Sequence, residues 1–168
     1  MNKMYITTGT KGYLQQLKNS HPGETMLLLE GEEDAMLLHE TAGETVFQEP
    51  RAYEVIDAVG PLVGAFVVCN NIPVTDEGRP LFEYRFQQRA RLIEQEPGFA
   101  AIRVLRPLSN DTYIIMTLWD GKEHFERWQH SQAFAKAHQQ GKETKPAGLR
   151  LFPRPSYITT YVVAKEGS

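Results

Sequence analysis

The chain has 168 residues and a formal net charge of −3, from 18 basic and 21 acidic side chains. Apolar residues make up 41% of the chain and charged residues 23%, which is ordinary for a globular protein and supplies no basic surface for nucleic acid. The single cysteine, Cys69, excludes an internal disulfide and a thiolate-rich metal site. Because Cys69 lies in an apolar run, we expect a buried thiol.

The distribution of apolar residues predicts a soluble, cytoplasmic protein. The first residues lack the continuous apolar core of a signal peptide. No stretch approaches the roughly 20 apolar residues that a membrane helix needs. We therefore expect neither a membrane partner nor a nucleic-acid partner.

Residues 1–60 predict the element order β-α-β-β-β. Helical spacing of Tyr13, Leu14 and Leu17 before the breaker Pro22 indicates one short helix. The expected elements are a strand at 4–9, a helix at 12–21, two hairpin strands at 25–31 and 35–43, and a strand at 44–60 with Pro50 as a bulge or break.

Residues 61–168 predict a more complete order, β-α-β-β-α-β. Phe82, Phe86, Ala90 and Ile93 recur at spacings of four, four and three, which indicates one helical face. The expected elements are strands at 64–74, 99–108, 112–119 and 156–164, and helices at 81–96, 120–130 and 131–141.

The second order is that of the ferredoxin-like fold, an α+β class. We therefore divide the chain into a ferredoxin-like domain at 61–168 and a truncated ferredoxin-like half at 1–60 that lacks the second helix. Helices cover only one face of such a sheet, so its other apolar face must be buried elsewhere. We expect residues 1–60 to cover it, which gives a monomer. A homodimer through the C-terminal sheets is the alternative.

The stretch from 124 to 138, "HFERWQHSQAFAKAH", contains three of the five histidines. Asp120 and Glu123 predict a capped helix start just before it. Ser131 predicts a second N-cap, so we expect the helix to break there. Trp128 then lies on the first helical segment and His138 on the second.

This stretch gives little support to a zinc site. His124 and His130 are six residues apart and point to different sides, and no other ligand stands at a suitable spacing. A lone histidine in aromatic surroundings, such as His138, is what haem iron needs. Core packing of Trp128 and a surface position for His138 are the commoner alternatives, and the residues alone leave them open. The other histidines are expected at the surface: His21, His39, His124 and His130.

Asn70 ends a predicted strand and shares one face with Phe66 and Val68 by the period of two. A polar amide on such a row must find a partner or contact a ligand. A strand-end residue that bonds the following turn is the alternative.

Two motifs resemble the Isd-type haem-degrading monooxygenases of the antibiotic biosynthesis monooxygenase superfamily, which form dimeric ferredoxin-like barrels. They are "NNIPVTDEGRPLFEYRF" at 70–86 and "TLWDGKEHFERWQHSQAFAKAH" at 117–138. The resemblance covers about 61–163. The whole chain, with its added N-terminal part, is similar to longer members of that group.

The resemblance implies three catalytic residues, Asn70, Trp128 and His138, and a pocket-lining Phe86. The asparagine matches Asn70 rather than Asn71, and the tryptophan matches Trp128 rather than Trp119. His138 is implied as the axial ligand of the haem iron. Trp128 is implied to ruffle the macrocycle, and Asn70 to orient the bound oxygen.

The resemblance further implies that haem is both cofactor and substrate, with O2 as co-substrate and an external electron donor. The products would be free iron and an opened tetrapyrrole. Arg103 and Lys136 are candidates for binding the haem propionates.

Two other functions are compatible with the same fold. A regulatory or signalling protein would use exposed histidines, such as His21 or His124, as phosphoacceptors. A cofactor-independent monooxygenase would need no iron ligand.

Overall fold

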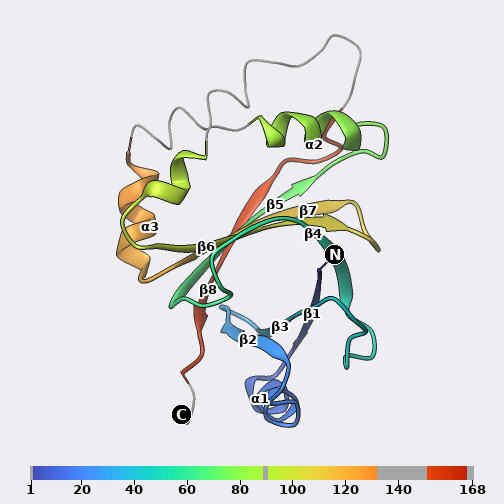
Figure 1. Ribbon diagram of the computed structural model, residues 1–168, viewed down its shortest axis with the longest axis vertical. Coiled ribbons are helices and arrows are strands. Elements are labelled where there is room, and N and C mark those ends of the chain that lie inside the picture. Colours follow the sequence, from blue (N-terminus) through green and yellow to red (C-terminus); the bar gives the residue numbers. More distant parts are fainter. Residues whose placement is uncertain (1, 89–90, 132–150, 166–168) are drawn as a thin grey trace.

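A computed structural model describes residues 2–88, 91–131 and 151–165. The described elements occur in an order that matches both predicted halves (Figure 1). They are β1 Lys3–Gly9, α1 Lys11–Asn19, β2 Thr25–Glu30, β3 Ala35–Thr41, β4 Arg51–Val59, β5 Phe66–Pro73, α2 Arg79–Gln87, the 3-10 helix η1 Leu92–Gln95, β6 Phe99–Pro107, β7 Thr112–Trp119, α3 Lys122–Gln129 and β8 Tyr157–Val163.

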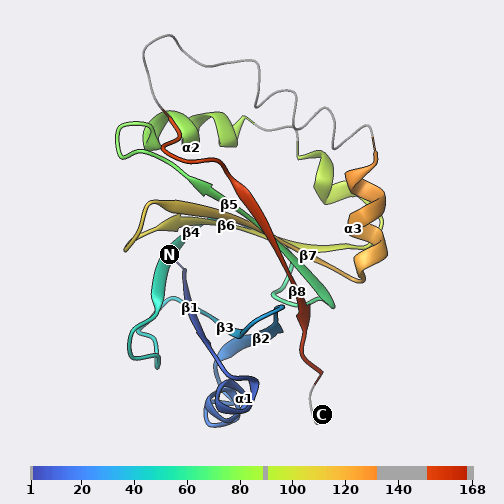
Figure 2. The same ribbon diagram turned by 180° about the vertical axis from the view of Figure 1, so that it is seen from behind.

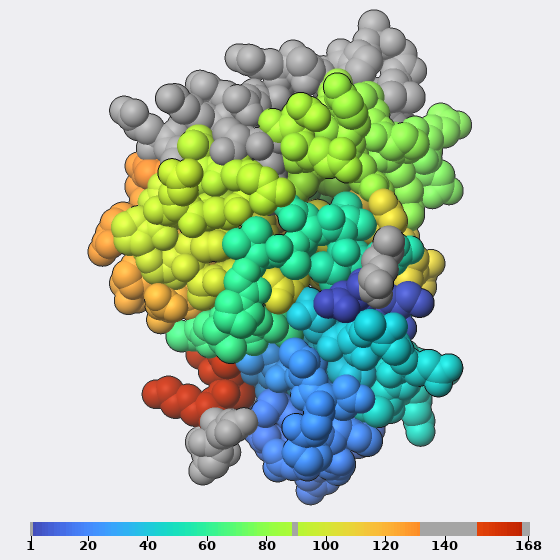
Figure 3. Space-filling view, in the orientation of Figure 1, coloured from blue at the N-terminus to red at the C-terminus, as the bar shows by residue number. Residues whose placement is uncertain are grey.

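The eight strands close into one antiparallel barrel in the order β1-β3-β2-β8-β5-β7-β6-β4. Each half of the chain arranges its four strands in the same order, with its fourth strand beside its first and its third beside its second. The N-terminal half thus covers the C-terminal sheet, as the sequence predicts, and Figure 3 shows the two halves packed directly together. The division at residue 60 stays a prediction, because both parts share this barrel.

The two seams between the halves are unequal. β4 and β6 pair through six residue pairs, from Tyr53–Pro107 to Val59–Ile102. β2 and β8 pair through only two, Leu29–Val163 and Glu30–Val162. The barrel is therefore firmly closed on one side and barely joined on the other.

Alternate residues of every strand fill the barrel with apolar side chains, because successive side chains point to opposite faces of a sheet. Both halves contribute to this core, whose buried members are Met4, Ile6, Leu29, Met36, Leu38, Tyr53, Leu62, Val67, Cys69, Ala101, Leu105, Ile114, Met116 and Leu118. Burial raises the pKa of the Cys69 thiol to about 12. The prediction of a buried thiol is confirmed.

The segment between β3 and β4 takes the place of the missing second helix. Its Phe47 is buried beneath α1 with Leu14 and Leu37. His39 lies in the same region, fully buried, with its Nδ1 3.0 Å from Thr45 Oγ1 and its ring edge-on to Phe47. The prediction of a surface position for His39 is wrong, because the period of two places it on the same outer face as Leu37, under the covering segment.

The predicted helix at 81–96 is interrupted. α2 ends at Gln87, and η1 begins after Arg91, whose φ of 54° is left-handed and cannot continue an α-helix. Ion pairs from Arg91 to Asp57 (3.0 Å) and Glu94 (3.2 Å) accompany this turn. Within the described ranges, no helix is both long and apolar enough to cross a membrane.

A buried ion pair joins the halves inside the barrel. Arg103 Nε on β6 donates to Glu40 Oε2 on β3 at 2.6 Å, and the two side chains are only 6% and 10% exposed. Arg103 also donates to the carbonyl oxygens of Val59 and Ile102. Several bonds therefore satisfy this guanidinium, and removal of either partner would leave a buried charge without compensation.

We expect Arg103→Met to lower the free energy of unfolding by about 3–5 kcal/mol, because it leaves the buried Glu40 carboxylate without its ion-pair partner. The double variant Arg103→Met/Glu40→Leu should recover most of this loss. Urea unfolding measures both effects. Lys122→Met is the control, since its pair with Glu126 is exposed and 3.8 Å long, and it should cost under about 1 kcal/mol. Equal costs for Arg103→Met and Lys122→Met would contradict the account.

Candidate functional site

The predicted site residues that the structure describes lie on the outer face of the C-terminal sheet. α2 and α3 both cover this side, whereas α1 lies on the far side of the barrel (Figures 1 and 2). Asn70 on β5 shares this face with Phe66 and Val68. Its neighbours across the sheet are Ile115 on β7 and Ile158 on β8.

Adjacent asparagines on β5 have different environments. Asn71 faces the barrel and is 6% exposed, and its Nδ2 donates to Cys69 O, Tyr157 O and Thr159 Oγ1 at 3.1–3.2 Å. Asn70 is half-buried on the helix side, and its side chain makes no hydrogen bond to any described residue. Asn71 is therefore structural, while the Asn70 amide is available to a ligand.

Two tryptophans pack beneath α3, with ring centroids 6.0 Å apart. Trp119 on β7 is fully buried and donates its Nε1–H to Thr117 Oγ1 at 3.0 Å, so its hydrogen-bonding group is satisfied within the sheet. Trp128 on α3 is 9% exposed and also contacts Phe125, at 6.2 Å between centroids. Trp128 thus contributes to an aromatic core and lies on the same side of the sheet as Asn70.

The start of α3 lies in close contact with Gly98 and lacks the predicted Asp120 cap. Gly121 is the N-cap and makes no side-chain cap bond, so that prediction is wrong. Gly98, with φ of 82°, lies so close to His124 that an added Cβ would be 2.1 Å from its Cγ. His124 is therefore half-buried, not at the surface as predicted, and the contact has room only for glycine at position 98.

α3 ends at the predicted break. It stops at Gln129, and the backbone N–H and the hydroxyl of Ser131 both donate to Trp128 O, at 3.0 and 2.6 Å. His130 is exposed, as expected, and His21 is half-buried. The predicted second helix lies outside the described residues.

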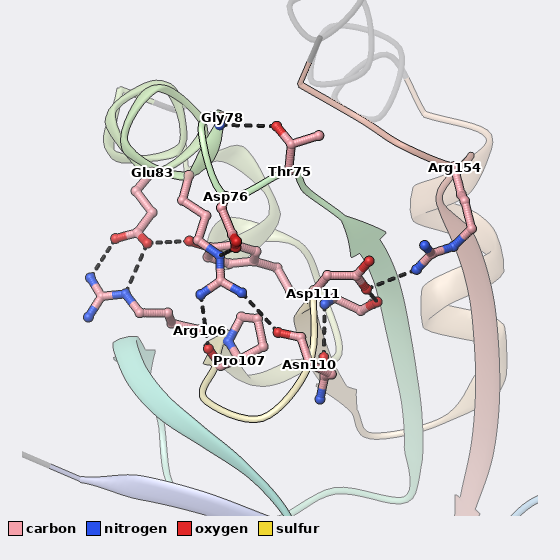
Figure 4. Close-up of polar contacts among 12 residues, drawn as sticks. Thr75, Asp76, Gly78, Glu83, Arg106, Pro107, Asn110, Asp111 and Arg154 are labelled. Carbon is pink, nitrogen blue, oxygen red and sulfur yellow. Dashed lines mark hydrogen bonds and ion pairs between the residues drawn. The ribbon is translucent and has the colours of Figure 1, made fainter.

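Phe86 lies on α2, a helix with no fully buried residue. Its ring is 6.4 Å from that of Phe82, which packs on Tyr113 of β7 at 4.7 Å. Polar contacts also hold α2, as Figure 4 shows: Arg79 donates to the carbonyl oxygens of Pro107 (3.1 Å) and Asn110 (2.8 Å). Phe86 is thereby placed over the same sheet face.

Glu83 anchors α2 through charge. Its carboxylate accepts hydrogen bonds from Arg106 Nε at 2.9 Å and from the Tyr113 hydroxyl (Figure 4). The hydrogen bond from Arg106 lowers the pKa of Glu83, while burial and the bond to Glu83 raise the pKa of Tyr113. Glu83 therefore stays ionised and Tyr113 stays a donor around neutral pH. Sequence reasoning missed this network, because its members lie far apart along the chain and carry no motif.

The remaining predicted residues do not complete the site in the described structure. His138 and Lys136 lie outside the described residues. Arg103 cannot bind a ligand beside Asn70, because it faces the barrel interior and pairs with Glu40. Among the described side chains, no group of three or more His, Cys, Asp or Glu could hold a metal ion.

Comparison with known proteins places these features in a family. The model of the antibiotic biosynthesis monooxygenase family matches residues 65–140. A heme-degrading monooxygenase of Listeria monocytogenes is 31% identical over 132 residues, which are 78% of this chain and 79% of that protein. The signal transduction protein TRAP of Staphylococcus aureus is 30% identical over 141 residues, covering 80% and 81%.

Among solved structures, a major regulator of staphylococcal pathogenesis aligns with a TM-score of 0.84 and 26% identity, over 96% of this chain and 99% of that one. A monooxygenase-like protein of Listeria innocua aligns with a TM-score of 0.75 and 28% identity, over 98% and 95%. On this similarity of sequence and fold, the chain belongs to the antibiotic biosynthesis monooxygenase family.

Proposed function

We propose that this protein is a haem-degrading monooxygenase. Haem would be both cofactor and substrate, O2 the co-substrate, and an external reductant the source of electrons. When bound, haem supplies the iron at which O2 is activated. The products would be free iron and an opened tetrapyrrole. The proposal agrees with the name of the relative from Listeria monocytogenes.

The observation that carries the proposal is the environment of Asn70. Its amide makes no hydrogen bond within the described structure, and apolar neighbours flank it, Ile115 on one side and the 47% exposed Ile158 on the other. A flat, apolar macrocycle fits such a surface, and a single amide suits the polar co-substrate. The residues present therefore fit haem.

Each residue of the proposed site would have a separate role. The Asn70 amide N–H would donate to the oxygen co-substrate and orient it. Trp128, on the side of α3 that packs against the sheet, would press on the macrocycle, and Phe86 would close the pocket from α2. His138 follows Trp128 by ten residues and would ligate the iron. The Glu83 network would keep α2, and with it Phe86, in place.

A regulatory function is the second candidate, because the relative called a signal transduction protein is nearly as similar. Phosphorylation of a histidine needs an accessible ring nitrogen. His39 is buried, His124 packs on Gly98 and His21 is half-buried, so His130 is the one exposed histidine among those described. Such a function, or a cofactor-independent oxygenation, would not require haem.

Haemin titration distinguishes these functions. We expect a Soret band that saturates near one equivalent and then decays when ascorbate is added in air. His138→Ala should weaken haem binding by about tenfold or more, because the iron loses its ligand. His130→Ala is the matched control and should bind normally. Absence of a band would exclude haem degradation, and a band unaffected by His138→Ala would exclude this ligand.

The neighbouring asparagines offer a paired test of the oxygen chemistry. Asn70→Ala should retain haem binding and leave the free energy of unfolding within about 0.5 kcal/mol of wild type. Its turnover should fall by about 10–100-fold. Asn71→Ala should instead lower the free energy of unfolding by about 1–3 kcal/mol, because the buried acceptors of its side-chain hydrogen bonds lose their donor. Chemical unfolding and single-turnover kinetics measure both variants. Normal turnover by Asn70→Ala would assign that residue a packing role only.

A further inference from the structure

The weak seam of the barrel opens into a pocket that the proposed function does not use. β2 ends at Glu30, so one edge of β8 has no described strand beside it from Tyr161 to Tyr157, while the other edge stays paired with β5. Figure 2 shows β8 extending past the end of β2. The resulting pocket is about 390 Å³ and is lined by Thr8, Arg51, the β2–β3 turn at 31–34, Met36 and β8 residues 158–161.

In the described structure, one edge of the β8 backbone is unpaired along this pocket. Val163 N donates to Ala65 O beside β5, whereas Ala164 N donates to Leu28 O beside β2. Backbone groups of a strand alternate between its two edges. The N–H and C=O groups of Ile158 and Thr160 therefore point away from β5 and toward the pocket, where no described strand meets them. A free edge of this kind accepts an added strand.

Charges of both signs surround the free edge. Among the described residues, the Arg51 guanidinium has two hydrogen-bond contacts, both long, to Tyr53 OH (3.4 Å) and Met36 Sδ (3.6 Å). At the rim lie three exposed acidic side chains: Glu32, Glu33 and Asp34. Within the described structure, none of these four groups forms an ion pair. The pocket thus offers separate places for an anionic and a cationic group.

We propose that this pocket binds a short, extended peptide with free termini. Its backbone pairs with the edge at Ile158 and Thr160, its carboxylate binds Arg51, and its terminal ammonium lies at the 31–34 turn. A strand rises about 3.3 Å per residue, so three residues span the free edge. A free amino acid has both charges but no amide to pair with the strand.

This site is distinct from the proposed haem surface. The pocket opens from the barrel mouth and the β8 edge, whereas Asn70 lies on the outer face of the sheet. Ile158 borders both places, because its side chain flanks Asn70 while its backbone faces the pocket. The outcome of a haem experiment therefore does not decide it.

Titration of the 15N-labelled full chain with trialanine tests the proposal. We expect saturable shifts of the Ile158 and Thr160 amide resonances. Arg51→Gln should weaken the binding of trialanine at least tenfold. Its affinity for trialanine should then equal that of wild type for trialanine amide, because the substitution and the amide each remove the same charge pair. Arg127→Gln, an exposed arginine of α3, should bind like wild type.

Two further probes separate the contributions. N-acetyl trialanine should bind more weakly than trialanine, because it lacks the ammonium. Alanine should bind more weakly still. The comparison of trialanine with its amide on wild type keeps the test valid if Arg51→Gln fails to fold. No saturable shift up to ~10 mM, equal binding of trialanine and its amide, or equal binding of trialanine and alanine would overturn the proposal.

Discussion

The structure depends on the burial of one apolar sheet face. A four-stranded ferredoxin-like sheet covered by helices on one side has a second face that water cannot favourably wet. Here the two halves of a single chain bury those faces against each other and close a barrel. The interior is thereby reserved for packing and for the Arg103–Glu40 pair. Only the outer faces and the mouth remain for ligands.

The two outer faces have diverged although the strand order is the same. In the N-terminal half, α1 and the segment bearing Phe47 fill the outer face, and even His39 is buried there. In the C-terminal half, α2 is attached largely through Glu83 and its partners, and the sheet beneath keeps an amide, Asn70, without a partner in the described structure. This asymmetry supports one ligand site on the outer faces of each barrel.

The sequence predicted the parts that depend on local pattern or on a simple burial argument. The period of two placed Asn70 on one face with Phe66 and Val68, and the family resemblance selected Asn70 over Asn71. The bare sheet face required the N-terminal half as its cover. Contacts between distant residues were not predictable. Nothing near Glu83 in the sequence indicates Tyr113 or Arg106, and the left-handed Arg91 interrupts a helix whose apolar spacing was regular. The assignment of His138 stays a prediction that rests on family resemblance.

The central claim is that one chain forms a complete barrel with one haem site. Native mass spectrometry of the haemin-loaded protein tests it most directly, because it reports chain number and haem number in one species. The account predicts one 19.1 kDa chain carrying one haem. Haem found only on a two-chain assembly, or two specifically bound haems on one chain, would contradict it.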